Sequence, residues 1–391
     1  MTEKSEALKK HYEWQGKIEV ISRATVNNRE DLALAYTPGV ADACLAIEKN
    51  PEEAYQLTRK NNMVAVITNG TAVLGLGDIG PEAAMPVMEG KAVLFKEFAD
   101  VDAFPLNIQA KDVETVVETI KQIASSFGAI NLEDIAAPEC FEIERRLKDE
   151  LNIPVFHDDQ HGTAIVVGAA LINAFRLFDN RELKSAKIII NGAGAAGIAI
   201  AKHLSSMGAK KLFLVDKRGI IHSAYPNITS EQKRVLNITN PEDQKGSLRE
   251  ALKDADVFIG VSAPNILTKE DIQVMKKDPI VFAMANPIPE IMPDLAMEAG
   301  VAVMGTGRSD FPNQINNVSA FPGIFKGALE AKATEINEAM RLAASYGIAN
   351  LVKDEELNSE YIIPDPFDDR IVPAVSKAVK DEAVKSNLVR S

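Results

Sequence analysis

Two groups of residues in this sequence have the types and spacing needed for chemistry. The first is the glycine-rich segment GAGAAG at residues 192–197, which follows an apolar run and precedes a helical pattern. The second consists of two acidic dipeptides, Glu133-Asp134 and Asp158-Asp159, each placed after a short apolar run. A glycine-rich turn between strand and helix is typical of dinucleotide binding, and clustered carboxylates suit a hard metal ion. The combination predicts redox chemistry assisted by a divalent cation.

The glycine-rich segment matches a dinucleotide fingerprint position by position. Residues 187–191 predict a buried strand, and apolar residues at helical spacing over 198–207 predict a helix. Gly192 permits the tight turn, Gly194 lets the backbone approach a pyrophosphate, and Gly197 lets helix and strand pack closely. The helix N-terminus is then left to bind the anion. We predict cofactor contacts from Gly192, Ala193, Gly194, Ala195, Ala196 and Gly197.

The end of the next predicted strand bears on the choice between NAD and NADP. Residues 211–215 form this strand, and Asp216 follows it, 19 residues beyond Gly197. A carboxylate near this spacing holds the ribose 2′-hydroxyl, so Asp216 favours NAD. The neighbouring Lys217 and Arg218 could instead receive a 2′-phosphate, which leaves NADP open.

A second GxGxxG match occurs at residues 75–80, before Pro81 and Pro86. Only about ten residues separate it from an apolar run at 92–95 that predicts a strand, which is too short for a crossover helix. We therefore predict a backbone turn near the active site here, and not a second dinucleotide site.

The acidic dipeptides can share one ligand only if their strands end there, because adjacent residues on a regular strand point to opposite faces. The strand expected over 153–156 ends directly before Asp158-Asp159, and the strand expected from residue 129 would have to end at Glu133-Asp134 in the same way. Open α/β sheets place their sites at such strand ends. All-oxygen ligands would suit Mg²⁺ or Mn²⁺. His157 and His161 imitate a zinc spacing, but that geometry requires a helix, and we expect a strand before them and Gly162 after them.

Composition limits the class of protein. A chain of 391 residues predicts two or three domains, and a net charge of −13 argues against nucleic acid or an anionic membrane as partner. No apolar run approaches the length of a membrane span and the N-terminus is polar, so we expect a cytoplasmic protein. Cys44 and Cys140 are expected to be buried free thiols.

The element pattern predicts an α/β fold. We expect helices over residues 1–53 with a break at 37–39, then alternating strands and helices, then a long helix over 163–178 before the Rossmann-type, doubly wound parallel sheet. Expected strands are 63–68, 92–95, 103–108, 129–135, 153–156, 187–191, 211–215, 257–261, 280–283 and 301–304. Expected domains are an N-terminal α/β domain at 1–158, a dinucleotide-binding domain at 159–322, and a helical segment at 323–391 that packs back on the first domain.

Seven segments in this order resemble the motifs of the malic enzymes, in particular the short bacterial type. They are AYTPGVA at 35–41, GLGDIG at 75–80, EGK at 89–91, LED at 132–134, FHDDQHGTA at 156–164, ANP at 285–287 and NNVSAFPG at 316–323. The resemblance covers most of the chain. It implies oxidative decarboxylation of L-malate to pyruvate and CO₂, reduction of NAD or NADP, a requirement for Mg²⁺ or Mn²⁺, and a homodimer.

The resemblance also implies roles for individual residues. Glu133, Asp134 and Asp159 would bind the metal. Lys91 would bind substrate and act as general base, for which burial and the nearby cation should lower its pKa.

The remaining implied roles concern proton transfer and binding. Tyr36 would be the general acid, and an active-site tyrosine so near the N-terminus could be donated across subunits. Asp158 would orient Lys91 or the metal ligands. Asn286 and Asn317 would bind the substrate carboxylates, and Asn286 and Thr163 would contact the cofactor.

One departure and two alternatives remain. Where larger family members carry an arginine before the GLGD motif, this chain has Thr71-Ala-Val73, so the cation that pairs with a substrate carboxylate is not identified. A malolactic or oxaloacetate-decarboxylating relative would use the same site. A non-catalytic nucleotide-sensing protein would keep the Rossmann scaffold and make Lys91 and Tyr36 dispensable.

Overall fold

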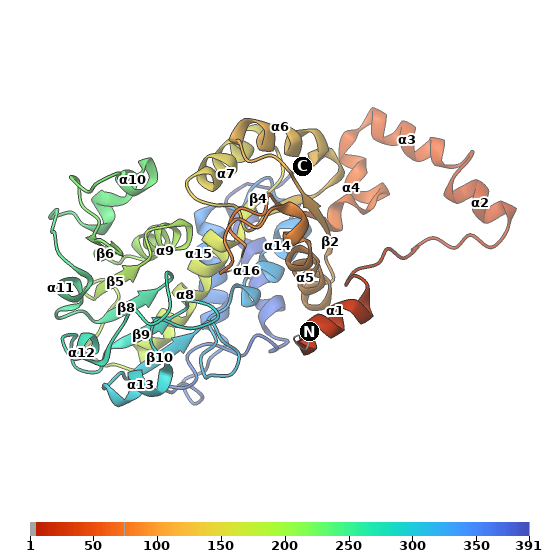
Figure 1. Cartoon of the computed structure of the whole chain (residues 1–391). Coiled ribbons are helices and arrows are strands. Elements are labelled where there is room, and N and C mark those ends of the chain that lie inside the picture. The colour runs from red at the N-terminus through yellow and green to blue at the C-terminus, as the bar shows by residue number, and fades with distance from the viewer. Residues whose placement is uncertain (1–4, 74, 391) are drawn as a thin grey trace.

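The computed structural model describes residues 5–73 and 75–390, which form two parallel sheets covered by helices (Figure 1). The first sheet has the order β2-β1-β3-β4, and all neighbouring strands are parallel. Its strands are β1 (Met63–Thr68), β2 (Asp102–Asn107), β3 (Ala129–Leu132) and β4 (Val155–His157). Because parallel strands need crossover connections, helices link them in turn: α5 (Pro81–Ala99), α6 (Val113–Ile123) followed by the 3₁₀ turn η3 (Ala124–Ser126), and α7 (Glu139–Glu150).

The strand predicted at residues 92–95 is wrong, because this run belongs to α5. Pro81 occupies the first turn of α5, where its missing N–H costs nothing, and Pro86 is accommodated within the helix. The buried residues Met88, Ala92, Phe95 and Ala99 recur at helical spacing. Contrary to the expectation, the second GxGxxG segment, at residues 75–80, is therefore followed by a helix long enough to serve as a crossover.

The second sheet has the order β10-β9-β8-β5-β6-β7, parallel except for the short edge strand β7. Its strands are β5 (Lys187–Asn191), β6 (Lys211–Asp216), β7 (Gly219–Ile220), β8 (Val257–Gly260), β9 (Ile280–Ala283) and β10 (Val303–Thr306). Its helices are α9 (Ala195–Ser206), α10 (Ser230–Thr239), α11 (Leu248–Leu252), α12 (Lys269–Ile272) and α13 (Pro293–Glu298). The predicted Rossmann-type sheet is confirmed, with β10 shifted by two residues from its expected position.

The long helix α8 (Asp158–Arg176) joins the two sheets and begins five residues earlier than predicted. The C-terminal elements are η4 (Asn317–Ser319), α14 (Phe321–Glu330), α15 (Glu338–Ala349) and α16 (Ile371–Lys385), so the helix expected after residue 323 is interrupted. Phe95 of α5 packs edge-on against Phe321 and Phe325 of α14, with ring centroids 4.8 and 5.1 Å away. Through these contacts α14 packs on α5, which belongs to the first sheet.

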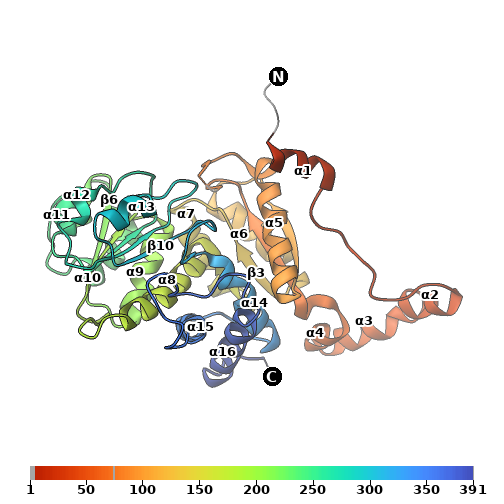
Figure 2. The same ribbon diagram turned by 90° about the horizontal axis from the view of Figure 1, so that it is seen from below.

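The N-terminal segment projects from this body to one side in both views, most clearly over residues 29–49 (Figures 1 and 2). It touches α5, where Lys17 Nζ donates to the Pro86 carbonyl at 2.7 Å, and it rejoins the body at Tyr55, which is buried. It consists of α1 (Glu6–Trp14), α2 (Arg29–Ala35), α3 (Val40–Lys49), η1 (Pro51–Glu53), α4 (Ala54–Leu57) and η2 (Arg59–Asn62). No residue of α1, α2 or α3 is buried, and residues 15–28 contain no helix, contrary to the expectation of a mainly helical segment. Cys44 lies here and is exposed, so the expectation that both thiols are buried holds only for Cys140.

In the part of the chain that the structure describes, no helix combines the length and the apolar character that a membrane crossing requires.

Candidate active site

The four acidic residues lie at the C-terminal ends of two neighbouring strands of the first sheet. Glu133 and Asp134 follow β3, and Asp158 and Asp159 are the first residues of α8, directly after β4. Because β3 and β4 are parallel neighbours with Leu132 opposite His157, the two acidic pairs emerge side by side. Ligand oxygens of Glu133, Asp134 and Asp159 lie within 4.8 Å of one another. An all-oxygen cluster of this kind fits Mg²⁺ or Mn²⁺.

The turn after β3 lets neighbouring acidic residues serve one site. Asp134 adopts a left-handed backbone conformation with φ of 52°, which ends the strand geometry. Its backbone N–H donates to Asp159 Oδ2 at 2.8 Å. Thr71 Oγ1 accepts from the N–H of Ala136 at 2.9 Å and so ties this turn to the loop after β1. Glu133 and Asp134 can share one ligand only if the strand ends before them, and β3 does end at Leu132.

Lys91 reaches the same cluster from α5. Its Nζ donates to Asp158 Oδ2 at 2.5 Å and lies 3.0 Å from Glu133 Oε1, with the lysine side chain 8% exposed. The ammonium also lies 4.0 Å from the ring centre of Phe321, a favourable cation–π contact from the C-terminal segment. Asn131 donates to Glu133 Oε2 at 2.8 Å and fixes the second oxygen of that carboxylate.

The pKa of Lys91 in this cluster differs from the expectation. Burial alone would lower the pKa of Lys91, but Asp158 and Glu133 outweigh burial and raise it. The lowered pKa predicted for Lys91 assumed a nearby cation as well as burial, and the protein by itself does not produce it. Burial raises the pKa of Asp158 to about 7 and that of Asp159 to about 6. Several carboxylates around a single ammonium leave surplus negative charge, which a bound divalent cation would offset.

Two of the predicted substrate and cofactor residues lie close to this cluster. Asn317 begins η4 and packs against the first turn of α8, since a Cβ built on Gly162 would lie 3.0 Å from the Asn317 Cβ. Thr163 follows Gly162 on α8 and is partly exposed.

Asn286 lies elsewhere, in the loop after β9 and beside two glycines. A Cβ on Gly75 would lie 3.2 Å from the Asn286 carbonyl oxygen, and one on Gly307 would lie 2.9 Å from its Nδ2. The GLGD turn and the Asn286 loop are thus neighbours. The buried carboxylate of Glu290 holds this loop by accepting from the N–H groups of Ser262 and Ala285, at 3.1 and 3.0 Å.

The dinucleotide fingerprint has the expected geometry. Gly192 has φ of 128°, and a Cβ on Gly197 would lie 1.7 Å from the Gly192 carbonyl oxygen, so both positions require glycine. Gly194 caps α9 without a side-chain hydrogen bond, and a Cβ there would meet no atom within 4 Å. This open space before a helix N-terminus fits a pyrophosphate. The binding roles of Ala193, Ala195 and Ala196 stay predictions.

Asp216 ends β6 beside the fingerprint strand and is already engaged. Its Oδ1 accepts from the Arg218 N–H at 2.8 Å and from the hydroxyl of Tyr225, and its Oδ2 lies 3.3 Å from Arg218 Nη2. The Arg218 guanidinium stacks over the Tyr225 ring, 4.5 Å from its centre. The carboxylate that would bind the ribose thus also holds the arginine that could bind a 2′-phosphate.

Tyr36 is not brought to the site within this chain. It caps α2 in the N-terminal segment, which projects to one side (Figure 2), and 67% of the residue is exposed. The zinc alternative is not supported, because α8 begins only at Asp158 and so does not carry both histidines, as the sequence indicated. His157 ends β4, and His161 forms a 2.7 Å hydrogen bond with Glu144.

Several residues that shape the site were missed from the sequence. Asn131 had a signal, a polar residue inside an otherwise apolar strand, whereas Phe321 and Glu290 had none, because their contacts depend on tertiary packing.

Comparison with known proteins identifies the family. The model of the malic enzyme N-terminal domain matches residues 15–112 and 107–148, and that of the malic enzyme NAD-binding domain matches residues 160–384. The chain belongs to the malic enzyme family.

Individual relatives cover nearly the whole chain. The bifunctional malic/malolactic enzyme of Bacillus subtilis is 56% identical over 100% of this chain and 95% of its own. The NADP-dependent malic enzyme of Halomonas elongata is 46% identical over 96% and 92%. The crystal structure of the NAD-dependent malic enzyme of Thermotoga maritima is 48% identical, with a TM-score of 0.92 over 96% of this chain and 99% of that one.

Gly162→Ala should disable the site without unfolding the protein. Alanine favours a helix over glycine by about 1 kcal/mol. A Cβ here, however, would lie 1.9 Å from Asp158 Oδ1 and displace the carboxylate that holds Lys91. We expect a loss of kcat of about a hundredfold and a lowered melting temperature with a single cooperative unfolding transition retained, measured by steady-state kinetics and calorimetry. Full activity would show that the position of Asp158 is unimportant, and Gly347→Ala on α15, where a Cβ would meet its nearest atoms at 3.4 Å, serves as control.

Proposed function

We propose that this protein catalyses the oxidative decarboxylation of L-malate to pyruvate and CO₂, with reduction of NAD or NADP and a divalent metal ion. The observation that carries the proposal is the buried Lys91, held by Asp158 and Glu133 beside a cluster of three carboxylates, in a chain with an intact dinucleotide fingerprint. Membership of the malic enzyme family supports the same reaction.

Glu133, Asp134 and Asp159 would hold Mg²⁺ or Mn²⁺. A divalent ion there supplies Lewis-acid polarisation of the substrate oxygens. Lys91, deprotonated once a bound cation offsets the charge of the carboxylates around it, would accept the proton of the C2 hydroxyl while the C2 hydride passes to the nicotinamide. Asp158, at hydrogen-bond distance from Lys91 Nζ, would orient the base. Asn317 and Asn286 would bind the substrate carboxylates, and Thr163 would contact the cofactor.

The step after loss of CO₂ needs a proton donor at C3, and we assign it to Tyr36 of a second copy of the chain. In one chain Tyr36 stands on a segment with large exposed apolar residues, among them Val20, Ile21, Leu34 and Leu45, each more than 60% exposed. Apolar surface of this extent is typical of an interface. A homodimer in which each N-terminal segment docks on the partner would cover these residues and complete both sites.

NAD is the cofactor we favour. Asp216, at the end of β6, would accept from the ribose 2′-hydroxyl, and its negative charge would oppose a 2′-phosphate.

Asp216→Ser should move the cofactor preference toward NADP. The change removes the opposing charge and releases Arg218, which would then be available to the 2′-phosphate. We expect the NADP/NAD ratio of kcat/KM to rise at least about tenfold, equivalent to about 1.4 kcal/mol. Asp254→Ser, a surface carboxylate change outside the fingerprint, is the control. An unchanged ratio would refute the assignment of Asp216.

Mixing two inactive variants tests the shared site. Tyr36→Phe and Lys91→Ala should each be inactive as homodimers. In statistically mixed dimers, one site in each heterodimer would carry both native residues, so activity should return to about a quarter of the wild-type value. If Tyr36 acts within its own chain, every site in the mixture lacks one residue and activity stays absent. Each variant unfolded and refolded alone is the control.

The reaction itself is tested by absorbance at 340 nm with L-malate, Mn²⁺ and either NAD or NADP, with pyruvate and lactate quantified. We expect equal amounts of reduced cofactor and pyruvate, and no reaction in EDTA or with Glu133→Gln, since both remove the cation. Lactate without net reduced cofactor would identify a malolactic reaction, which the name of the Bacillus subtilis relative makes a specific alternative. Absence of any product, together with retained NAD binding in Lys91→Ala, would favour a nucleotide-sensing protein.

A further inference from the structure

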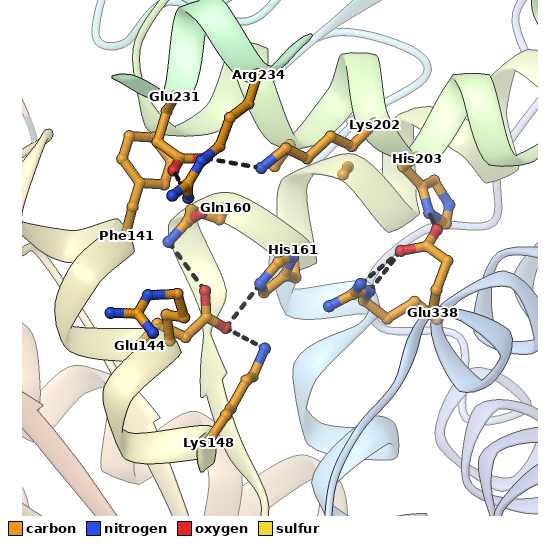
Figure 3. Close-up of a pocket in the computed structure, with 14 residues that line it drawn as sticks. Phe141, Glu144, Lys148, Gln160, His161, Lys202, His203, Glu231, Arg234 and Glu338 are labelled. Atoms are coloured by element: carbon orange, nitrogen blue, oxygen red, sulfur yellow. Dashed lines mark hydrogen bonds and ion pairs between the residues drawn. The ribbon is translucent and has the colours of Figure 1, made fainter. Parts of the chain in front are cut away.

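A cavity of about 290 Å³, lined mainly by charged residues, lies beside the first turn of α8 (Figure 3). Gln160 and His161, which line it, directly follow Asp158 and Asp159 of the candidate active site. The other lining side chains come from α7 of the first sheet, from α9 and α10 of the second, and from α15 of the C-terminal segment. The protein has two halves, one built on each sheet, and α8 joins them. Residues of both halves and of α8 line the cavity.

Basic side chains predominate around this cavity. They are Arg145, Lys148, Lys202, Arg234 and Arg341, against the carboxylates of Glu144, Glu231 and Glu338. Arg145 pairs with Glu142 and Asp149, outside the cavity, which leaves four bases and three carboxylates around the space itself.

Ion pairs hold these bases in place. Glu144, whose side chain is 7% exposed, accepts from Lys148 at 2.6 Å, from His161 at 2.7 Å and from Gln160 at 3.3 Å. Burial opposes ionisation of Glu144, but His161 and Lys148 keep its pKa well below the usual range.

Glu231 and Glu338 likewise hold basic side chains of the cavity in ion pairs. Glu231 pairs with Lys202 at 3.1 Å and with Arg234. Glu338 accepts from His203 at 2.9 Å and from Arg341 at 2.5 and 3.0 Å. The bases are thus pre-positioned, and Arg341 Nη1 is not used in the pair with Glu338.

Size and charge define the ligand that would fit. The volume lies at the lower end of ligand pockets, about 300–1,000 Å³, so a whole dinucleotide is excluded. The excess of positive charge disfavours a cation, and the apolar lining is limited to Phe141, Ala164 and Ala199. A small metabolite with a phosphate or with two carboxylates matches this lining.

We propose that this cavity is an effector site for such a small anion. A ligand bound between Lys148 of α7 and Lys202 or Arg234 of the second half would fix the two halves relative to each other. It would also fix the first turn of α8, which carries the active-site carboxylates. The effect on turnover depends on the malic enzyme reaction proposed above, whereas the binding itself does not.

Calorimetric titration of the full chain with Mg²⁺ and NAD present tests the binding. Glycerol 3-phosphate and glutarate are the two probes, one for each anion source, and the tighter probe identifies the source. We expect a submillimolar Kd for at least one, weakened at least about tenfold in Lys148→Gln/Arg234→Gln. Lys377→Gln/Lys385→Gln on α16 removes the same charge away from the cavity and should bind as wild type. Equal binding by the cavity variant, or no binding by wild type below about 10 mM, would overturn the site.

Ala199→Leu fills the cavity without changing its charge. It therefore tests whether the probes bind in the cavity even if Lys148→Gln/Arg234→Gln does not fold. It should abolish binding of both probes. The second readout is the rate with malate at fixed metal and NAD. The bound probe should change kcat or KM at least about twofold in wild type and in the α16 control, and not in the cavity variants. Binding without any kinetic change would overturn the effector role, whereas binding in a protein that does not oxidise malate would leave the site standing and refute the proposed reaction instead.

Discussion

The ion network around Lys91 is the interaction on which the rest of the structure depends. An ammonium and several carboxylates removed from water are stable together only when each finds a partner at short range. Here Asp158 and Glu133 supply that partner, Asn131 satisfies the remaining glutamate oxygen, and Phe321 closes the side toward the C-terminal segment. Because these residues come from α5, β3, α8 and α14, the network forms only when four distant parts of the chain have assembled. The surplus of negative charge then explains why the same place suits a divalent cation.

Helix α8 gives this network its connection to the rest of the molecule. Its first residues belong to the acidic cluster, its next residues line the cavity, and its body packs between the two sheets. Packed helices move as rigid units, so a shift at the first turn cannot remain local. The fold thereby puts two residues of the acidic cluster, the partner of Lys91 and the contacts between the two halves on one element. A glycine at position 162 is the local requirement, since any larger residue would collide with Asp158.

The sequence predicted those features that are set within a few residues. The strands β1 and β5, the glycines of the fingerprint and Asp216 depend on local pattern, and the structure places them as expected. Failures occurred where tertiary packing overrides a short pattern. The apolar run at 92–95 is the buried face of a helix and not a strand, because the period of α5 emerges only over its full length. The pKa of Lys91 was expected to fall with burial, but the two carboxylates that reverse this effect come from other elements. The exposure of Tyr36 likewise depends on where the whole N-terminal segment lies.

The separation of Lys91 from Tyr36 divides the proposed reaction between two kinds of structure. Lys91 sits in a network that one chain completes by itself, so hydride transfer and its proton acceptor need only the folded monomer. Tyr36 stands on a segment with no buried residue in α1, α2 or α3, and such a segment gains a fixed position only by packing against another surface. If a second chain provides that surface, protonation at C3 becomes the step that depends on association. Dilution of the protein would then slow the final protonation before it slows the oxidation of malate. A site built within one chain would lose both steps together.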